Sequence, residues 1–146
     1  MHAHKLNSSK AQVSLEYLVV VGMILAASVP VWMFAQNSMS EAQFELDAST
    51  ARAAAEVVAG AADWAVLSGY PARKTVEITL PRSIENAYVS DREVRLVYWG
   101  ASGLTEAYSV SDANLTGAIP IGGTKARLVV AAMESPRGNV SITSVG

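Results

Sequence analysis

The sequence holds few of the side chains on which catalysis and metal binding most often depend. It has no cysteine, and its two histidines are His2 and His4. Thiol nucleophiles and cysteine metal sites are therefore excluded, and beyond Lys5 the chain has no imidazole to act as general base or metal ligand. The acidic residues of the C-terminal half lack the spacing of a calcium loop. We expect no enzyme activity, no catalytic residue, no metal site and no cofactor.

Polar side chains alternate at the start of a long apolar run. Gln12, Ser14 and Glu16 follow a short basic stretch that contains Lys5 and Lys10. A carboxylate inside a bilayer costs several kcal/mol by most estimates and is normally paired, so its position singles out Glu16 as a functional residue. The alternative is that Glu16 lies at the level of the lipid headgroups and stays hydrated.

Beyond the apolar run, two triplets match the acceptor pattern for N-linked glycans. They are Asn114-Leu115-Thr116 and Asn139-Val140-Ser141. The pattern implies a surface position in an exported protein, so Asn114 and Asn139 are candidate glycosylation sites. Asn7-Ser8-Ser9 fits the same pattern but belongs to the basic stretch, which we expect to stay in the cytoplasm.

The element that positions the N-terminal polar residues is a run of membrane length. Nineteen consecutive uncharged residues extend from Tyr17 to Ala35. As a helix this run measures roughly 28 Å, close to the thickness of a bilayer core. We therefore predict that Gln12–Phe34 is a membrane-inserted helix. A buried core helix and a secretory signal peptide, with a weak small-residue cleavage site at 26–28, are the alternatives.

The flanking charges predict the orientation of this helix. Lys5 and Lys10 precede it, and Glu41, Glu45 and Asp47 follow it. The excess of lysine on one side favours a cytoplasmic N-terminus and an extracellular remainder.

The helical pattern continues beyond the membrane-length run. Small and apolar residues recur at steps of four and three, which predicts a packing seam. Gly69 and Pro71 predict that the helix ends at Ser68, and Pro30 predicts a bend near residues 26–30, where Ser28 is a candidate donor to the freed carbonyls. The charged residues Glu45, Arg52, Glu56 and Asp63 lie off the seam. The seam consists of Phe44, Ala48, Ala51, Ala55, Val58, Ala62 and Ala65.

After Pro71 the pattern changes to the alternation of β-strands. We predict five or six strands in an antiparallel head domain, with Gly117–Gly123 as a loop. The aromatic residues Tyr70, Tyr88, Tyr98, Trp99 and Tyr108 are expected in the core or at its junction with the helix. The predicted strands are 75–80, a hairpin of 87–90 and 93–99 around Asp91-Arg92, then 104–110 after a turn at 100–103, and a pair 125–133 and 139–145 joined at Pro136-Arg137-Gly138.

The segment from Lys10 to Val20 resembles the class III signal peptide of archaeal type IV pilin-like proteins. In that family a glutamine, a serine and a glutamate alternate before an aliphatic run, as Gln12, Ser14 and Glu16 do here. Val20 stands where the family prefers leucine, which keeps the apolar character. The motif covers about nine residues, and a long helix followed by a β head agrees with pilin architecture over nearly the whole chain.

The resemblance implies a processing step and a set of partners. A prepilin peptidase would cut between Ala11 and Gln12 on the cytoplasmic side, which divides the chain into a leader (1–11), a long helix (12–68) and a head (70–146). The new amine of Gln12 could then pair with Glu16 of a neighbouring copy. Further implied partners are other copies in a helical filament, the assembly ATPase and its membrane platform protein.

These observations predict an α+β structural subunit of an archaeal type IV-like adhesion pilus. It would be held in the membrane as a precursor and then enter an extracellular filament on the cell surface. The net charge is −2 and the basic residues are scattered, so nucleic-acid binding is not expected. The alternative functions are a single-span membrane protein whose β domain binds or senses a ligand alone, and a membrane-tethered hydrolase.

Overall fold

The structure is a computed structural model of the 146-residue chain and describes residues 3–134 and 138–145, with side chains from Val13 onward. One helix precedes five strand elements, so the predicted α+β class is confirmed. The chain divides into two compact units, residues 1–41 and 42–146. The elements are α1 (Ala3–Ser68), β1 (Arg73–Thr79), β2 (Ile84–Gly100), β3 (Gly103–Gly117), β4 (Lys125–Ala132) and β5 (Asn139–Ser144).

Helix α1 ends at the predicted residue and begins nine residues before its predicted start. It stops at Ser68, where Gly69 adopts a positive φ of 69° and its N–H bonds to the Ala65 carbonyl at 3.0 Å. The helix starts at Ala3 rather than Gln12, so the expected leader is helical where it is described.

Helix α1 is continuous through Pro30, which lacks the N–H that would bond to the Ala26 carbonyl. The Ser28 hydroxyl donates instead to the Leu25 carbonyl at 2.7 Å. The proposal that Ser28 satisfies the carbonyl freed by Pro30 is therefore wrong, and the bend near residues 26–30 stays a prediction.

The strands form one sheet in the order β1-β4-β5-β3-β2. Every neighbouring pair is antiparallel except β3 and β5, which are parallel. The predicted antiparallel sheet is therefore confirmed except for this pair, which is parallel because two reversals, into β4 and into β5, return the chain to the direction of β3. Gly117 ends β3 with a φ of 132°, and a Cβ at Gly117 would collide with the Ile142 carbonyl of β5. Gly117 therefore belongs to the strand, and the predicted loop begins at Ala118.

The 17-residue segment β2 folds back on itself, as the predicted hairpin requires. Fully extended, it would measure about 55 Å. Yet the Trp99 N–H bonds to the carbonyl of Ser83, just before β2, at 3.0 Å, and the Trp99 indole donates to Glu85 at 3.1 Å. Asp91 adopts a left-handed φ of 52° at the predicted turn. The bounds of β1, β4 and β5 agree with the predicted strands to within two residues, whereas β3 continues to Gly117 instead of ending at Val110. Pro136 and Arg137 of the last predicted turn lie outside the described residues.

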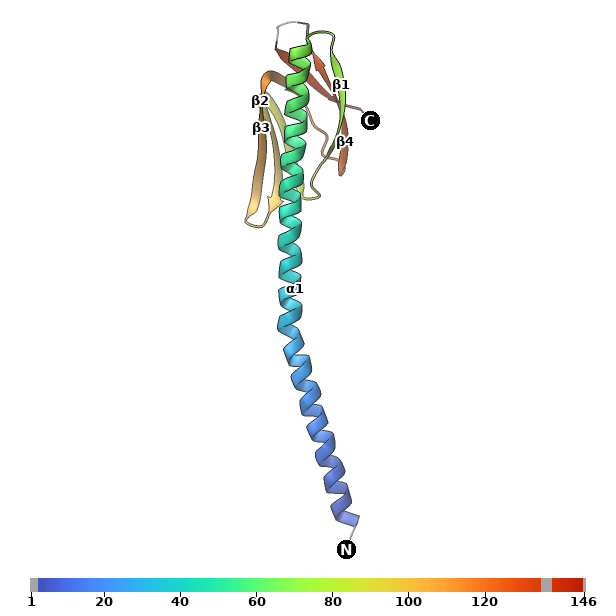
Figure 1. Ribbon diagram of the computed structural model, residues 1–146. Coiled ribbons are helices and arrows are strands. Elements are labelled where there is room, and N and C mark those ends of the chain that lie inside the picture. The colour runs from blue at the N-terminus through green and yellow to red at the C-terminus, as the bar shows by residue number, and fades with distance from the viewer. Residues whose placement is uncertain (1–2, 135–137, 146) are drawn as a thin grey trace. The chain divides into compact units, whose positions relative to one another are not determined.

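The core of residues 42–146 lies between the C-terminal part of α1 and one face of the sheet. In Figure 1 this green part of α1 crosses the sheet, with β1 and β4 on one side and β2 and β3 on the other. Alternate residues of the strands face the helix and are buried, among them Val94, Leu96, Leu115, Leu128 and Val140. Of the five aromatic residues expected in the core or at its junction with the helix, only Tyr98 is buried, at 4% exposure.

The placement of the other four aromatics is a correction with a physical cause. Tyr70, Tyr88, Trp99 and Tyr108 are each at least half exposed. The helix meets the sheet mainly through alanine, which allows close approach and leaves little volume for large rings. The sheet therefore fills the narrow interface with Val, Leu and Ile and directs most of its aromatic side chains outward.

Candidate assembly surface on the long helix

The described residues of the processing motif are exposed on α1 but do not all share one face. Ser14 and Glu16 are exposed, and Val20 is 54% exposed. Glu16 and Val20 are four residues apart and share a face of the helix, whereas Ser14 is half a turn from Glu16. Ala11 and Gln12 lie within the helix, and their side chains lie outside the described part of the chain.

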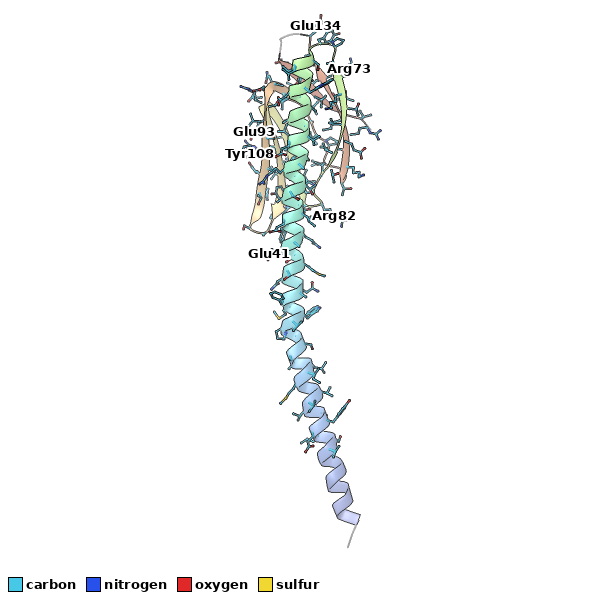
Figure 2. The ribbon with its side chains drawn as sticks, viewed as in Figure 1. Glu41, Arg73, Arg82, Glu93, Tyr108 and Glu134 are labelled. Carbon is cyan, nitrogen blue, oxygen red and sulfur yellow. The ribbon has the colours of Figure 1, made fainter. Side chains whose placement is uncertain are left out.

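The membrane-length segment is apolar on every side. Its large side chains are exposed, from Val13 at 66% to Phe34 at 74%, except for the half-buried Val21, and none of the most hydrophobic stretch is buried. In Figure 2 the side chains of the blue part of α1 project in all directions from the ribbon. In the part of the chain that the structure describes, this segment therefore lacks the burial of a soluble core helix. Within the described residues, α1 is long and apolar enough to cross a membrane.

The predicted packing seam is confirmed. Ala51, Ala55, Val58, Ala62 and Ala65 are each 0% exposed, and Phe44 and Ala48 at its start are half-buried. The apolar partner that this seam required is the sheet of the same chain.

A second row of residues on α1 repeats the spacing of the seam two positions later and was not predicted from the sequence. It consists of Leu46, Thr50, Ala53, Val57, Gly60, Trp64 and Leu67, with the same steps of four and three. Two residues correspond to about 200° around a helix, so this row lies opposite the seam. We call these seven residues the outer strip. Leu46 is 65%, Val57 45% and Leu67 87% exposed, and no member carries a charge.

The outer strip is bounded on its two sides by different surfaces. Glu45, Arg52 and Glu56 are exposed and form a charged flank on one side. On the other side a groove runs between the helix and β1, lined by Ala53 and Val57 among others from the helix and by Glu77 and Thr79 from the strand side. Lys74 of β1 lies over the Trp64 ring, 5.5 Å from its centroid. The strip is thus a defined apolar surface with polar borders.

Two aspartates of α1 fasten the helix to the sheet, and neither role was anticipated. The Asp47 carboxylate accepts a hydrogen bond from the Ser83 hydroxyl. The Asp63 carboxylate accepts from the Ser111 hydroxyl at 2.6 Å and from the Asp112 N–H at 2.7 Å. Ser111 is 1% exposed, and its oxygen accepts in turn from Ala113 N–H. The sequence shows only that each carboxylate lies near the packing seam of the helix. The spacing along the helix does not show which serine of the distant segments bonds to it.

The outward face of β2 and β3 is polar and aromatic. Arg95 forms ion pairs with Glu93 at 3.3 Å and Glu106 at 3.5 Å, and Tyr88 and Tyr108 are exposed. Figure 2 labels Glu93 and Tyr108 on this side of the sheet. The hydrogen bond to Glu93, followed by the charges of Glu93 and Glu106, raises the pKa of Arg95 above its usual value. This face therefore carries a permanent positive charge held between two carboxylates.

The two candidate glycosylation sites, far apart in the sequence, come together in the sheet. Asn114 of β3 and Asn139 of β5 are paired residues, and their side-chain amides are joined by a hydrogen bond of 3.2 Å. No pattern in the sequence indicates this proximity.

Together these features define an α+β protein with one long helix that has a membrane-length apolar segment and, farther along, a buried face against a five-stranded sheet. Comparison of the chain with protein-family models, with curated proteins and with solved structures found no match.

Proposed function

We propose that this protein is the structural subunit of an archaeal type IV-like adhesion pilus and that it polymerises through α1. The observation that carries the proposal is the exposed outer strip from Leu46 to Leu67, which follows the membrane-length segment on the same helix. A helix that only anchors a protein in a membrane needs the membrane-length apolar segment and no apolar row beyond it. A regular uncharged row of exposed Leu, Val and Trp beyond it needs a protein partner.

Length supports this distinction. A bilayer core covers about 30 Å, or roughly twenty helical residues. The segment from Gln12 to Ser68 would measure roughly 85 Å, so most of the outer strip stays outside any membrane that holds residues 17–35. Water would otherwise surround these side chains, and their burial against another chain is favourable by about 25 cal/mol per Å² of apolar surface.

The two apolar surfaces of α1 differ, and this difference favours a filament over a closed dimer. The outer strip of one copy offers a narrow row, whereas the segment 13–35 of another copy is apolar all round and fits that row. Contact between two different surfaces of identical subunits is heterologous, and it propagates as an open helical polymer unless the rotation closes a ring. The apolar segment, on leaving lipid, would then be surrounded by neighbouring helices instead of water.

The processing motif gives the assembly a starting point. In this proposal a prepilin peptidase cuts between Ala11 and Gln12, and the positive amine of Gln12 pairs with the exposed Glu16 carboxylate of a neighbour. An assembly ATPase and a membrane platform protein would drive the transfer from membrane to filament. The head, residues 70–146, would face the outside of the cell.

N-terminal sequencing of the protein from its native cells tests processing, and electron microscopy of the cell surface tests assembly. We expect a mature start at Gln12 and filaments whose main protein is this chain. Glu16→Ala should abolish filaments while the chain stays in the membrane, and Glu41→Ala, a matched carboxylate beyond the span, should not. An intact Met1 with no filaments would instead favour a single-span protein whose head binds or senses a ligand alone.

A further inference from the structure

The two sequons of the head are aligned with each other residue by residue. β3 and β5 are parallel, and their register pairs Asn114 with Asn139, Leu115 with Val140 and Thr116 with Ser141. Each position of one acceptor triplet therefore lies beside the same position of the other. The backbone is held as well, because Asn114 N–H donates to the Gly138 carbonyl at 2.7 Å.

The side chains of the paired sequons alternate between the core and the outer face of the sheet. Leu115 and Val140 are 1% and 0% exposed and face the helix. The asparagines therefore point outward together with Thr116, whose hydroxyl lies 3.3 Å from the Val140 carbonyl that it contacts. Asn114 is exposed and Asn139 is half-buried. The Asn114 Nδ2, the atom that a glycan would take, already donates to Asn139 Oδ1 at 3.2 Å.

We propose that these two sequons form one modification site that carries a single N-linked glycan per chain, on Asn114 in preference to Asn139. The proposal rests on the outward orientation of the head in the proposed function. The donor is a polyisoprenyl phosphate-linked oligosaccharide. Asn114 Nδ2 bonds to the anomeric carbon of the sugar and loses one proton, and the anomeric C–O bond breaks with its electron pair left on the phosphate oxygen.

Geometry limits the pair to one glycan. Neighbouring strands lie about 4.8 Å apart, which is less than the width of a sugar ring with its substituents. A glycan on Asn114 covers the outer face beside Asn139, and a second ring on Asn139 would have to share that space. The preference for Asn114 follows from its greater exposure and from its earlier place in the chain, since it leaves the membrane before β5 is available to pair with it.

Intact mass and glycopeptide mapping of the protein from its native cells test the proposal. We expect one glycan mass per chain, found on Asn114. Asn139→Gln should leave the mass and its position unchanged. Asn114→Gln should move the glycan to Asn139, because the competing group is gone, and the double variant should carry none. Thr116→Val, which removes only the sequon hydroxyl, should act like Asn114→Gln. Asn86→Gln, an amide that bonds to Tyr88 outside any sequon, is the matched control and should change nothing.

Two glycans on one chain, or a wild-type glycan on Asn139 alone, would overturn the inference. So would two unmodified asparagines in a head that external protease can cleave on intact cells, and that result would leave the filament proposal standing. Conversely, the filament-deficient Glu16→Ala chain should still carry one glycan while anchored in the membrane. Failure of assembly and failure of this inference are therefore distinguishable.

Discussion

The two parts of α1 are continuous in sequence and differ in how their apolar residues are arranged. Between Val13 and Phe34 large side chains cover the whole circumference, and no charge occurs from Tyr17 to Ser40. Between Ala42 and Ser68 the seam and the outer strip lie on opposite sides of the helix, and the charged residues Glu45, Arg52 and Glu56 lie between them on one flank. One row is alanine-rich and buried, and the other contains the exposed Leu46, Val57 and Leu67.

The difference shows how one helix can suit two environments. Lipid surrounds a helix from all sides, so every side must be apolar. A protein surface touches one side, so a row with steps of four and three is enough, and the rest can carry charges. The outer strip follows the second rule, although most of it is exposed among the described residues. In our account it is the surface reserved for a neighbouring copy.

The largest expected effect is a difference in stability between two aspartate variants at adjacent residues, one in the seam and one on the outer strip. Val58→Asp would bury an unpaired carboxylate against Ala55 and Ala62 and should cost at least about 4 kcal/mol, which would unfold a marginal head. Val57→Asp, on the outer strip, should change the free energy of unfolding by less than about 0.5 kcal/mol and abolish filaments. Thermal unfolding of the detergent-solubilised chains, with electron microscopy of cells, measures both. Equal loss of stability in the two variants would contradict the distinction between the rows.

A charge in the first part of α1 should act on the membrane and spare the head. Leu25→Asp should disfavour insertion by about 2.5–3.5 kcal/mol at the centre of the span. The head of Leu25→Asp should unfold at the wild-type temperature, because residues 42–146 form their own compact unit. The fraction of chain in the membrane and the melting temperature of the head are the two measurements. Leu25→Ala is the control and should behave as wild type, and a shared loss of head stability would show that the two parts are not independent.

Loss of the Asp63 contact should lower the free energy of unfolding by less than a charge placed in the seam. Asp63→Ala leaves the buried Ser111 hydroxyl and the Asp112 N–H without their acceptor and should cost about 1–3 kcal/mol. Glu56→Ala removes an exposed carboxylate of the same helix and should change stability by less than about 0.5 kcal/mol. Denaturant unfolding compares the two variants. If Asp63→Ala were as stable as Glu56→Ala, the hydrogen bonds of Asp63 to the sheet would contribute nothing to the free energy of unfolding.

The smallest effect concerns the border of the outer strip. Lys74→Met removes the cation over Trp64 and should cost about 0.5–1 kcal/mol at this partly exposed site. Arg73→Met changes the neighbouring charge on β1 without that contact and serves as the control. Denaturant unfolding and the fluorescence of the chain follow the change. An identical response in both variants would remove Lys74 from the description of this surface.

Much of the fold was predictable because its signals are local or periodic. The seam from Phe44 to Ala65, the end of α1 at Gly69 and the reversal of β2 at Asp91 each follow from spacing or from the needs of a turn. Pairings between distant segments carry no such signal. The parallel contact of β3 with β5, and with it the meeting of Asn114 and Asn139, depends on the order in which strands enter the sheet.

The candidate assembly surface was predictable in part. The apolar segment and the seam were predictable because each consists of apolar residues that are either consecutive or spaced at steps of four and three. The outer strip has the same spacing but was not predicted, because Thr50 and Gly60 dilute its apolar character. The aromatic residues were misplaced because size was read as burial, whereas an alanine-rich interface has little room for large rings.

The most direct test of the account is the accessibility of the outer strip in the assembled protein. The chain has no cysteine, so Val57→Cys introduces the single thiol, and Tyr108→Cys places one on the outward face of the sheet as a control. With a membrane-impermeant maleimide, we expect both variants to label in detergent-solubilised chains. In surface filaments Tyr108→Cys should still label and Val57→Cys should not. Labelling of Val57→Cys in filaments as fast as in the solubilised chain would contradict the claim that this strip is covered by a neighbouring copy.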